Sequence, residues 1–308
     1  MQRSDLGTES FLSVAREARG RVDAGGLGMA WAMWPGHAAP VVGLHGVTAS
    51  YMNFVGVAEM LRGRASLLAL DLRGRGDTDK PGGGPFGMSQ HAADVAAAIA
   101  AFGLGPSVVV GHSMGAFVAV ALAAEHPELV SGLVLVDGGL PLEVPAGIPP
   151  EQLLDVALAA QMARLRTTYD SLESYLDYWR SLPVFADGLW NDWVERYLSY
   201  DLGGDPPSMR PKASETAVRG DFADTLEADR LRGWLTEVKV PVLLLRATEG
   251  FEPGSPPLLP DALVQREGKL VTDLTERVVE ATHYSIALSS SGAETVADGI
   301  VEWTHRCA

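Results

Sequence analysis

The stretch that decides the fold is residues 107–125, which read SVVVGHSMGAFVAVALAAE. Residues 107–110 form a short β-branched run typical of a buried strand, and residues 116–125 form an Ala-rich run typical of a helix. Between them, Gly111-His112-Ser113-Met114-Gly115 matches the pattern G-x-S-x-G. The bare pattern is weak, but its place between a strand and a helix predicts a serine on a sharp turn.

The chemistry of such a turn explains its small residues. A serine there has strained backbone angles, so the residues two before and two after it must be small, as Gly111 and Gly115 are. The helix that begins at the turn directs its free N–H groups and its positive end at the serine, where they favour an oxyanion. Ser113 is therefore a candidate nucleophile, and the alternative is a serine that only caps the helix.

Outward from this stretch, short apolar runs alternate with helix-like runs, which is the rhythm of a mostly parallel sheet covered on both faces. The predicted strands are residues 40–44, 66–72, 107–110, 133–136, 240–245 and 277–280. The predicted helices include residues 88–102, 115–125 and 293–303. Residues 27–34 alternate loosely and predict an antiparallel edge strand.

This alternation of strand-like and helix-like runs is interrupted once, between residues 138 and 233, where strand-like runs nearly disappear and Trp and Tyr are frequent. This segment predicts a helical cap inserted over the ends of the strands, with residues 1–137 and 234–308 forming the core domain. Its aromatic residues either pack the insertion onto the core or form the apolar underside of a lid.

Composition excludes several classes of partner. The formal net charge of −15, with no Lys/Arg cluster, disfavours nucleic acid and anionic membrane surfaces. The single cysteine, Cys307, allows no internal disulfide and no cysteine-based zinc site. The first 25 residues contain no apolar stretch of signal-peptide length, and no run approaches a membrane helix, so the sequence predicts a cytoplasmic protein.

Four features in chain order resemble the α/β-hydrolase superfamily: His45-Gly46-Val47-Thr48, the loop Asp71-Leu72-Arg73-Gly74-Arg75-Gly76, the Ser113 turn and a late histidine, His283. The resemblance spans nearly the whole chain. It implies an α/β fold with an eight-stranded, mostly parallel sheet, helices on both faces, and a helical cap after the sixth strand. It also implies a catalytic serine, acid and histidine in that order, as in the ester and lactone hydrolases of the superfamily.

A serine hydroxyl needs a general base within hydrogen-bond reach, and an imidazole that titrates near neutral pH suits this role. Among seven histidines, His283 follows the last strand-like run and precedes the final helix, where the superfamily places its base. His112 is adjacent to Ser113 but is expected to point away from it. His45 belongs to the first loop of the resemblance, so we expect structural roles for both.

The imidazole needs a carboxylate that fixes its tautomer, and the sequence offers two. The commonest superfamily position follows the seventh strand, where this chain has Ala247-Thr248-Glu249-Gly250, with glycine at the expected acid and Glu249 one residue early. Asp137 instead ends the sixth-strand run, a position from which some members supply their acid. We favour Asp137 and keep Glu249 as the alternative; Asp137 could also merely cap the loop before Gly138-Gly139.

The resemblance also implies an oxyanion hole made by the backbone N–H groups of Val47 and Met114. The sequence therefore predicts a serine hydrolase that cleaves a carboxylic ester or lactone through an acyl-enzyme, with no metal or organic cofactor. The substrate is expected to be a small molecule with an apolar or aromatic part. The alternatives are carbon–carbon bond hydrolysis, perhydrolysis, cofactor-free oxygenation, or a ligand receptor that retains the site.

Overall fold

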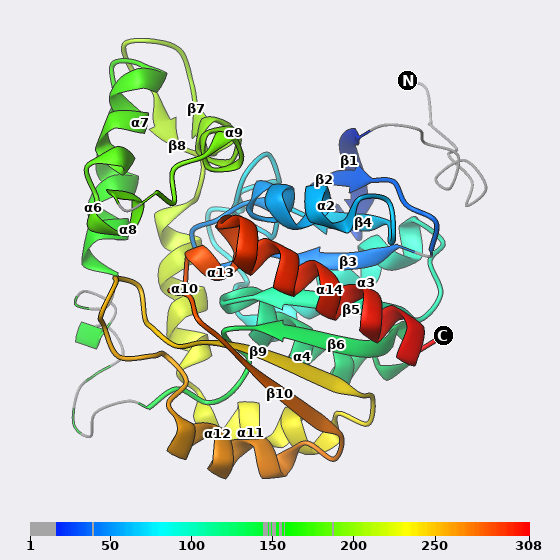
Figure 1. Cartoon of the computed structure of the whole chain (residues 1–308). Helices are drawn as coiled ribbons and strands as arrows, with labels where there is room; N and C mark the ends of the chain where they lie inside the picture. The colour runs from blue at the N-terminus through cyan, green and yellow to red at the C-terminus, as the bar shows by residue number, and fades with distance from the viewer. Residues whose placement is uncertain are drawn as a thin grey trace.

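The computed structural model describes residues 17–308 except residues 39, 144–146, 148, 150, 151, 154, 155, 157 and 187. Their centre is an eight-stranded sheet with the order β1-β2-β4-β3-β5-β6-β9-β10 (Figure 1). Each neighbouring pair from β4 to β10 is parallel, and β2 is antiparallel to both β1 and β4. The predicted α/β fold with a mostly parallel sheet is confirmed.

The strands lie close to the predicted runs. They are β1 (Ala18–Ala24), β2 (Leu27–Trp34), β3 (Val41–Leu44), β4 (Leu67–Leu70), β5 (Ser107–His112), β6 (Val130–Val136), β9 (Val242–Ala247) and β10 (Leu274–Val279). The antiparallel direction of β2 is confirmed, but its edge position is wrong because β1 lies outside it. Arg19, Arg21 and Asp23 alternate along β1, so this half-exposed strand has no apolar run.

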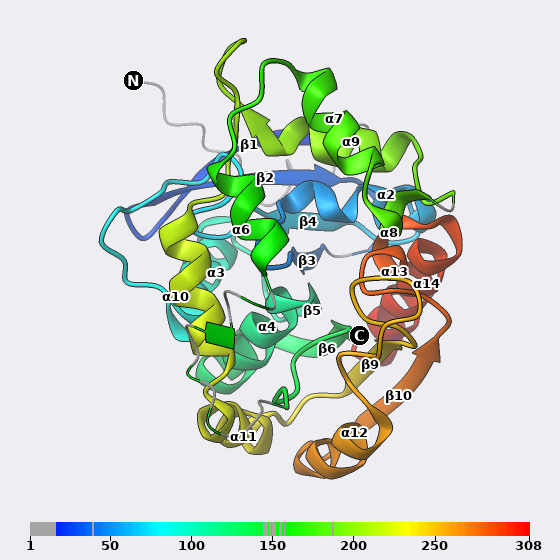
Figure 2. The ribbon, with the colours of Figure 1, turned by 90° about the vertical axis from the view of Figure 1, so that its left-hand side faces the viewer.

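The sheet is buried on both faces because its central strands alternate their side chains between two cores. Val108 and Val110 of β5 belong to one core cluster, and Val109 between them belongs to the other. Helices α2 (Val55–Leu61) and α14 (Ser290–Arg306) cover the first face. Helices α3 (Met88–Ala101) and α4 (Met114–Glu125) cover the second face (Figure 2). The central strand ends, where Ser113 lies, are therefore held by packing from two sides.

The remaining elements complete the two layers and the insertion. They are η1 (Tyr51–Phe54), α3 (Met88–Ala101), α4 (Met114–Glu125), η2 (Pro127–Leu129), α6 (Ala159–Arg166), α7 (Leu172–Arg180), α8 (Pro183–Ala186), α9 (Asp192–Asp201), β7 (Leu202–Gly203), β8 (Arg210–Pro211), α10 (Glu215–Thr225), α11 (Ala228–Glu237), α12 (Asp261–Glu267), η3 (Gly268–Leu270) and α13 (Ser285–Leu288).

The insertion between β6 and β9 contains α6 to α10 and the short ribbon of β7 and β8. Figure 1 shows α6, α7, α8 and α9 together beside one end of the sheet. Part of its aromatic content packs internally: the ring centroids of Tyr169 and Tyr175 are 4.8 Å apart, and those of Trp179 and Phe185 are 5.4 Å apart. The predicted boundary at residue 233 falls inside α11, which packs in the same core cluster as α4.

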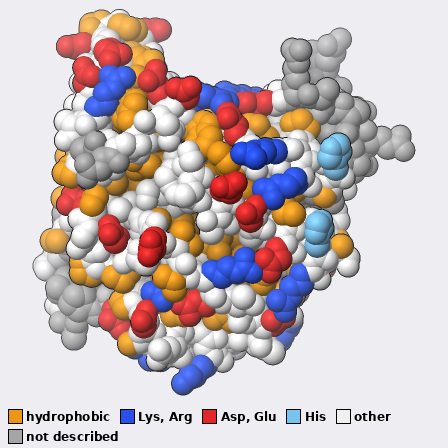
Figure 3. All heavy atoms as spheres, in the orientation of Figure 1, with side chains coloured by type: hydrophobic (Ala, Val, Ile, Leu, Met, Phe, Trp, Pro, Cys, Tyr) orange, Lys and Arg blue, Asp and Glu red, His pale blue; other side chains and the backbone are white. Residues whose placement is uncertain are grey.

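The surface carries both signs of charge in spite of the acidic composition. On the face shown in Figure 3, basic and acidic side chains lie beside one another. Exposed pairs such as Arg277 with Glu302 and Arg306 with Asp273 account for part of this mixing. Within the described ranges, no helix has both the length and the apolar character needed to cross a membrane.

Candidate active site

Ser113 lies on the turn between β5 and α4. Its backbone angles, φ 56° and ψ −122°, belong to a region that residues other than glycine rarely adopt. The Ser113 N–H donates to the Val136 carbonyl at 2.9 Å, which ties the turn to the end of β6. A side chain at Gly115 would overlap the Leu44 carbonyl, so glycine is required there. The turn therefore holds the Ser113 hydroxyl at the ends of the central strands.

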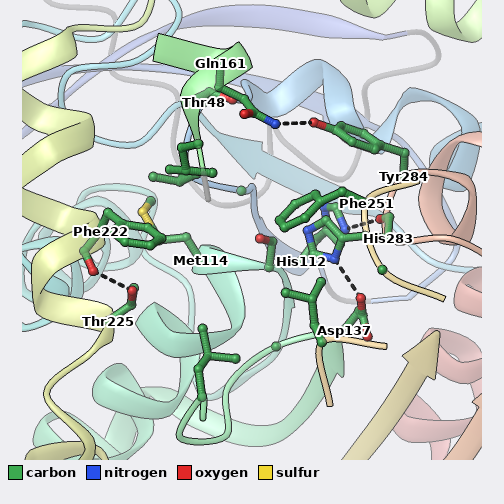
Figure 4. Close-up of a pocket in the computed structure, with 18 of the residues that line it drawn as sticks. Thr48, His112, Met114, Asp137, Gln161, Phe222, Thr225, Phe251, His283 and Tyr284 are labelled. Atoms are coloured by element: carbon green, nitrogen blue, oxygen red, sulfur yellow. Dashed lines mark hydrogen bonds and ion pairs between the residues drawn. The ribbon is translucent and has the colours of Figure 1, made fainter. Parts of the chain in front are cut away.

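His283 and Asp137 meet beside this turn. His283 follows β10, and its Nδ1 lies 2.6 Å from Asp137 Oδ2 in a buried pair (Figure 4). A carboxylate only accepts, so the ring proton lies on Nδ1 and Nε2 is left to accept a proton. The other oxygen, Asp137 Oδ1, accepts the Ala247 N–H at 3.1 Å. Both oxygens are thereby fixed in position.

The Ser113 hydroxyl itself makes no hydrogen bond to any described residue in this structure. In enzymes without substrate this contact is often long, and it tightens when substrate binds. Ser113 and His283 both line one cavity, so the two side chains reach a common space.

Glu249, the alternative acid, lies elsewhere. Its carboxylate accepts the Gly254 N–H at 2.9 Å, which closes the loop after β9. Its own N–H donates to the Ala281 carbonyl at 3.1 Å, so the backbone of Glu249 supports the segment before His283. Of the two candidate acids, the structure brings Asp137 to the imidazole and gives Glu249 a contact within its own loop.

The backbone N–H groups of Val47 and Met114 belong to two residues that line the same cavity. Met114 is the first residue of α4, where an N–H has no partner within the helix. Arg75 holds the backbone of Val47 in place, because its Nε donates to the Val47 carbonyl at 2.9 Å. Arg75 is fully buried and is paired with the equally buried Asp221 of α10, which connects the insertion to this loop. The arrangement suits an oxyanion hole.

His45 and His112 are neutral structural groups. His45 Nε2 accepts the Leu72 N–H at 2.9 Å, and its Nδ1 donates to the Gly46 carbonyl at 2.8 Å. His112 Nε2 donates to the His283 carbonyl at 3.0 Å and so supports the loop of that residue. Burial lowers the pKa of each ring to about 3. Both rings therefore stay uncharged at neutral pH.

These two histidines predict a loss of stability in mild acid. The unfolded chain binds a proton at each histidine near pH 6.5, whereas the folded protein binds it only near pH 3. Unfolding therefore takes up protons in this window, and stability falls as the pH falls. We expect the two histidines to lower the free energy of unfolding by about 2 kcal/mol between pH 6.5 and 5.5, and buried Asp71, whose pKa is raised to about 7, to offset about 1 kcal/mol of this decrease, as measured by urea titration.

Single-histidine variants provide the control for this prediction. His112→Gln keeps a donor near the His283 carbonyl and should remove the contribution of one histidine, about 1 kcal/mol, from the change in the free energy of unfolding between pH 6.5 and 5.5. His305→Gln removes an exposed histidine at the end of α14 and should leave the slope unchanged. Equal slopes in the wild type and in His112→Gln would contradict the assignment.

A cavity of about 700 Å³ joins the strand ends to the insertion. Ser113, Asp137 and His283 line it from the core, and Tyr197 and Phe222 line it from the insertion. Figure 4 shows Met114, Phe222, Phe251 and Tyr284 around the site, so the lining is rich in apolar and aromatic side chains. A cavity of this size and character suits a small organic molecule.

Several cavity residues are absent from the predicted site. Phe251 packs its ring against His283 with centroids 4.7 Å apart, and Asn53 lines the cavity from η1. Both lie in segments without a motif, and only the folded sheet brings them to Ser113. Tyr284, adjacent to His283, could have been considered because the two side chains lie on one loop.

Comparison with known proteins places this site in a family. Residues 39–285 match the model of the alpha/beta hydrolase fold. A 2-(acetamidomethylene)succinate hydrolase of Mesorhizobium japonicum is 31% identical over 249 residues, which are 78% of this chain and 80% of that protein. A crystal structure of E-2-(acetamidomethylene)succinate hydrolase matches with a TM-score of 0.74 and 26% identity, covering 94% of this chain and 99% of that one.

A more distant neighbour supports the fold alone. The thioesterase domain from the curacin biosynthetic pathway matches with a TM-score of 0.71 at 18% identity, covering 92% of this chain and 98% of that chain. Since the family model spans most of the sequence and the Mesorhizobium relative aligns over four fifths of its own length, this chain belongs to the alpha/beta hydrolase family.

Proposed function

We propose that this hydrolase cleaves a carboxylic ester or lactone, with Ser113, His283 and Asp137 as its catalytic triad. The observation that carries the proposal is the 2.6 Å contact between His283 Nδ1 and Asp137 Oδ2 beside the strained Ser113 turn. A serine at this turn supports acyl transfer, because hydrolases of the superfamily that use an aspartate nucleophile need a carboxylate there.

The proposed reaction has two halves. His283 Nε2 takes the Ser113 proton as Oγ attacks the carbonyl carbon, and the oxyanion accepts hydrogen bonds from Val47 and Met114 N–H. When the tetrahedral intermediate collapses, the bond to the alcohol oxygen breaks and His283 returns the proton to that oxygen. The acyl group is then bound to Ser113. Water attacks this acyl-enzyme with His283 as base, and the acid is released.

Asp137 acts through His283 in this scheme. Its carboxylate holds Nδ1–H and stabilises the imidazolium that forms in each half-reaction. The positive φ of 47° at Asp137 shows that its backbone is also held in an unusual conformation. We propose further that residues 138–233, apart from the part of α11 that packs with the core, form the cap, since α10 and α9 contribute Phe222 and Tyr197 to the cavity.

The reaction is tested with a panel of 4-nitrophenyl esters and lactones assayed with and without a serine-directed phosphonate. We expect saturable hydrolysis of at least the apolar esters, and its loss after phosphonate treatment. No turnover of any ester or lactone, with Ser113 still labelled by the phosphonate, would instead favour carbon–carbon hydrolysis or perhydrolysis. No turnover over the whole panel and no labelling of Ser113 by the phosphonate would contradict the proposed function.

A further inference from the structure

Arg75, in the loop after β4, contacts both residues of the proposed oxyanion hole. Its Nε donates to the Val47 carbonyl at 2.9 Å, and its Nη2 donates to Met114 Sδ at 3.8 Å. Its Nη1 donates to the Arg73 carbonyl at 2.9 Å, which ties the side chain to its own loop. Arg75 is fully buried, so water does not compete for these contacts. One guanidinium therefore bridges the two chain segments that supply the hole.

The contact to the Val47 carbonyl matters because of how the Val47 N–H is held. This N–H shares a planar trans peptide with the Gly46 carbonyl, so the two groups point in opposite directions. His45 Nδ1 and the Ala49 N–H donate to the Gly46 carbonyl at 2.8 and 3.1 Å. Arg75 holds the next peptide through its carbonyl. With both peptides held, the Val47 N–H has a fixed direction before a substrate binds, as an oxyanion hole requires.

Asp221, on helix α10 of the insertion, holds Arg75 in this position. Its Oδ2 accepts a hydrogen bond from Arg75 Nη1 and lies 3.0 Å from His91 Nε2. Its Oδ1 accepts the Gly87 N–H at 2.6 Å. Burial by itself would raise the pKa of Asp221, but the adjacent charge of Arg75 lowers it below its ordinary value. The next residue, Phe222, lines the cavity, so the helix that reaches the cavity also carries the carboxylate that places Arg75.

The neighbouring arginine of the same loop is bound differently. Arg73 Nε and Nη2 donate to Asp94 of α3 at 2.7 and 2.6 Å, and both side chains are buried. Among the described residues, the hydrogen bonds of the Arg73 side chain all go to this carboxylate. Arg73 therefore joins two elements of the core, and its pair with Asp94 has the chemistry of the Arg75 pair without the bonds to the oxyanion hole.

We infer that Arg75 is a positioning residue for the oxyanion hole and that Asp221 places it, so that the docking of α10 on the core sets the geometry of the hole. This inference rests on the proposed function and deepens it. Both side chains are fully buried, and neither is among the described residues that line the cavity, so they act through Val47 and Met114. Their loss should affect the transition state, in which the oxyanion exists, more than the bound substrate.

The test compares matched changes at the two pairs: Arg75→Lys and Asp221→Asn against Arg73→Lys and Asp94→Asn. Lysine keeps the charge but not the planar fork that donates in several directions. The substrates are a 4-nitrophenyl ester and its thionoester, in which the carbonyl oxygen is replaced by sulfur, a poor hydrogen-bond acceptor. For Arg75→Lys and Asp221→Asn, we expect kcat for the ester to fall by about 10- to 100-fold, with KM within about threefold of the wild type.

The ratio of kcat/KM for the ester to that for the thionoester reports on the oxyanion hole itself. We expect this ratio to fall by about tenfold in Arg75→Lys and Asp221→Asn, because the thionoester gains less from the hole. In Arg73→Lys and Asp94→Asn, we expect kcat and the ratio to stay within about threefold of the wild type, even if both variants melt at a lower temperature.

The possible failures are distinguishable. Equal losses at the two pairs, or equal losses on the ester and the thionoester, would show a structural role and overturn the inference. An Arg75→Lys variant with wild-type kcat and ratio would overturn it too. If the single variants do not fold, Arg75→Met/Asp221→Asn, which removes both buried charges, is measured in their place. If the wild type hydrolyses no ester and phosphonate does not label Ser113, the proposed function fails as well.

Discussion

We expect Ser113→Ala to abolish measurable ester hydrolysis, with kcat reduced by about 10⁴- to 10⁶-fold. The change removes the oxygen that forms the acyl-enzyme, so only the catalysis that water achieves in a preformed oxyanion hole remains. The measurement is the steady-state rate with the best 4-nitrophenyl ester, at enzyme concentrations high enough to bound the residual rate.

A second serine in the same cavity provides the control. Ser255 lines the cavity, and its hydroxyl donates to the Glu252 carbonyl at 2.6 Å, so Ser255→Ala removes a hydroxyl that has no role in the mechanism. We expect its rate to stay within about tenfold of the wild type. A Ser113→Ala variant that retained wild-type hydrolysis while melting at the same temperature would refute the acyl-enzyme mechanism.

Asp137→Asn lowers kcat by about 10⁴-fold, the second large effect that we expect. Asparagine has nearly the same shape, but its amide cannot hold the imidazole in the tautomer with the proton on Nδ1, and it carries no charge to stabilise the imidazolium. The contact of 2.6 Å to His283 and the bond from Ala247 N–H make the position sensitive to this single atom change.

Glu249→Gln is the matched control, because it is the same chemical change at the other candidate acid. Its carboxylate accepts only the Gly254 N–H among the hydrogen bonds of the described residues, so we expect a rate within about threefold of the wild type. The opposite pattern, with a strong loss of rate in Glu249→Gln and little loss in Asp137→Asn, would show that Glu249, after β9, is the catalytic acid.

The sequence was sufficient for the fold because its signals are local. Residues 107–125 predict β5, the turn and α4 almost to the residue, since a β-branched run and an Ala-rich run differ in both composition and periodicity. β1 escaped prediction because it is an edge strand with alternating Arg and Asp side chains. The ribbon of β7 and β8 was not predicted, because strands of two residues are too short to show an alternation of apolar and polar residues.

Part of the candidate site was also predictable from local sequence signals. Ser113 and His283 each follow a recognisable strand, but Asp137 and Glu249 both do as well, and the sequence favours Asp137 only by its place directly at the strand end. The choice depends on how far each strand extends and where its loop turns. Asp137 N–H donates to Leu245 O at 2.8 Å, which places its side chain at the strand end beside His283.

Several residues that line the cavity could not be predicted at all. Asn53 from η1, Phe222 from α10 and Phe251 from the loop after β9 meet only because the sheet order brings β3, β5 and β9 together and the insertion packs over them. None of these residues belongs to a motif. Their residue types are common throughout the chain, and only their position in the folded protein shows that they line the cavity.

The most direct test of the central claim is mass spectrometry of the intact protein after reaction with a fluorophosphonate, followed by peptide mapping. We predict one adduct per chain, on the peptide that contains Ser113, with strongly reduced labelling in His283→Ala because the base is missing. An adduct on another residue, or hydrolysis that continues with Ser113 unlabelled, would contradict the account.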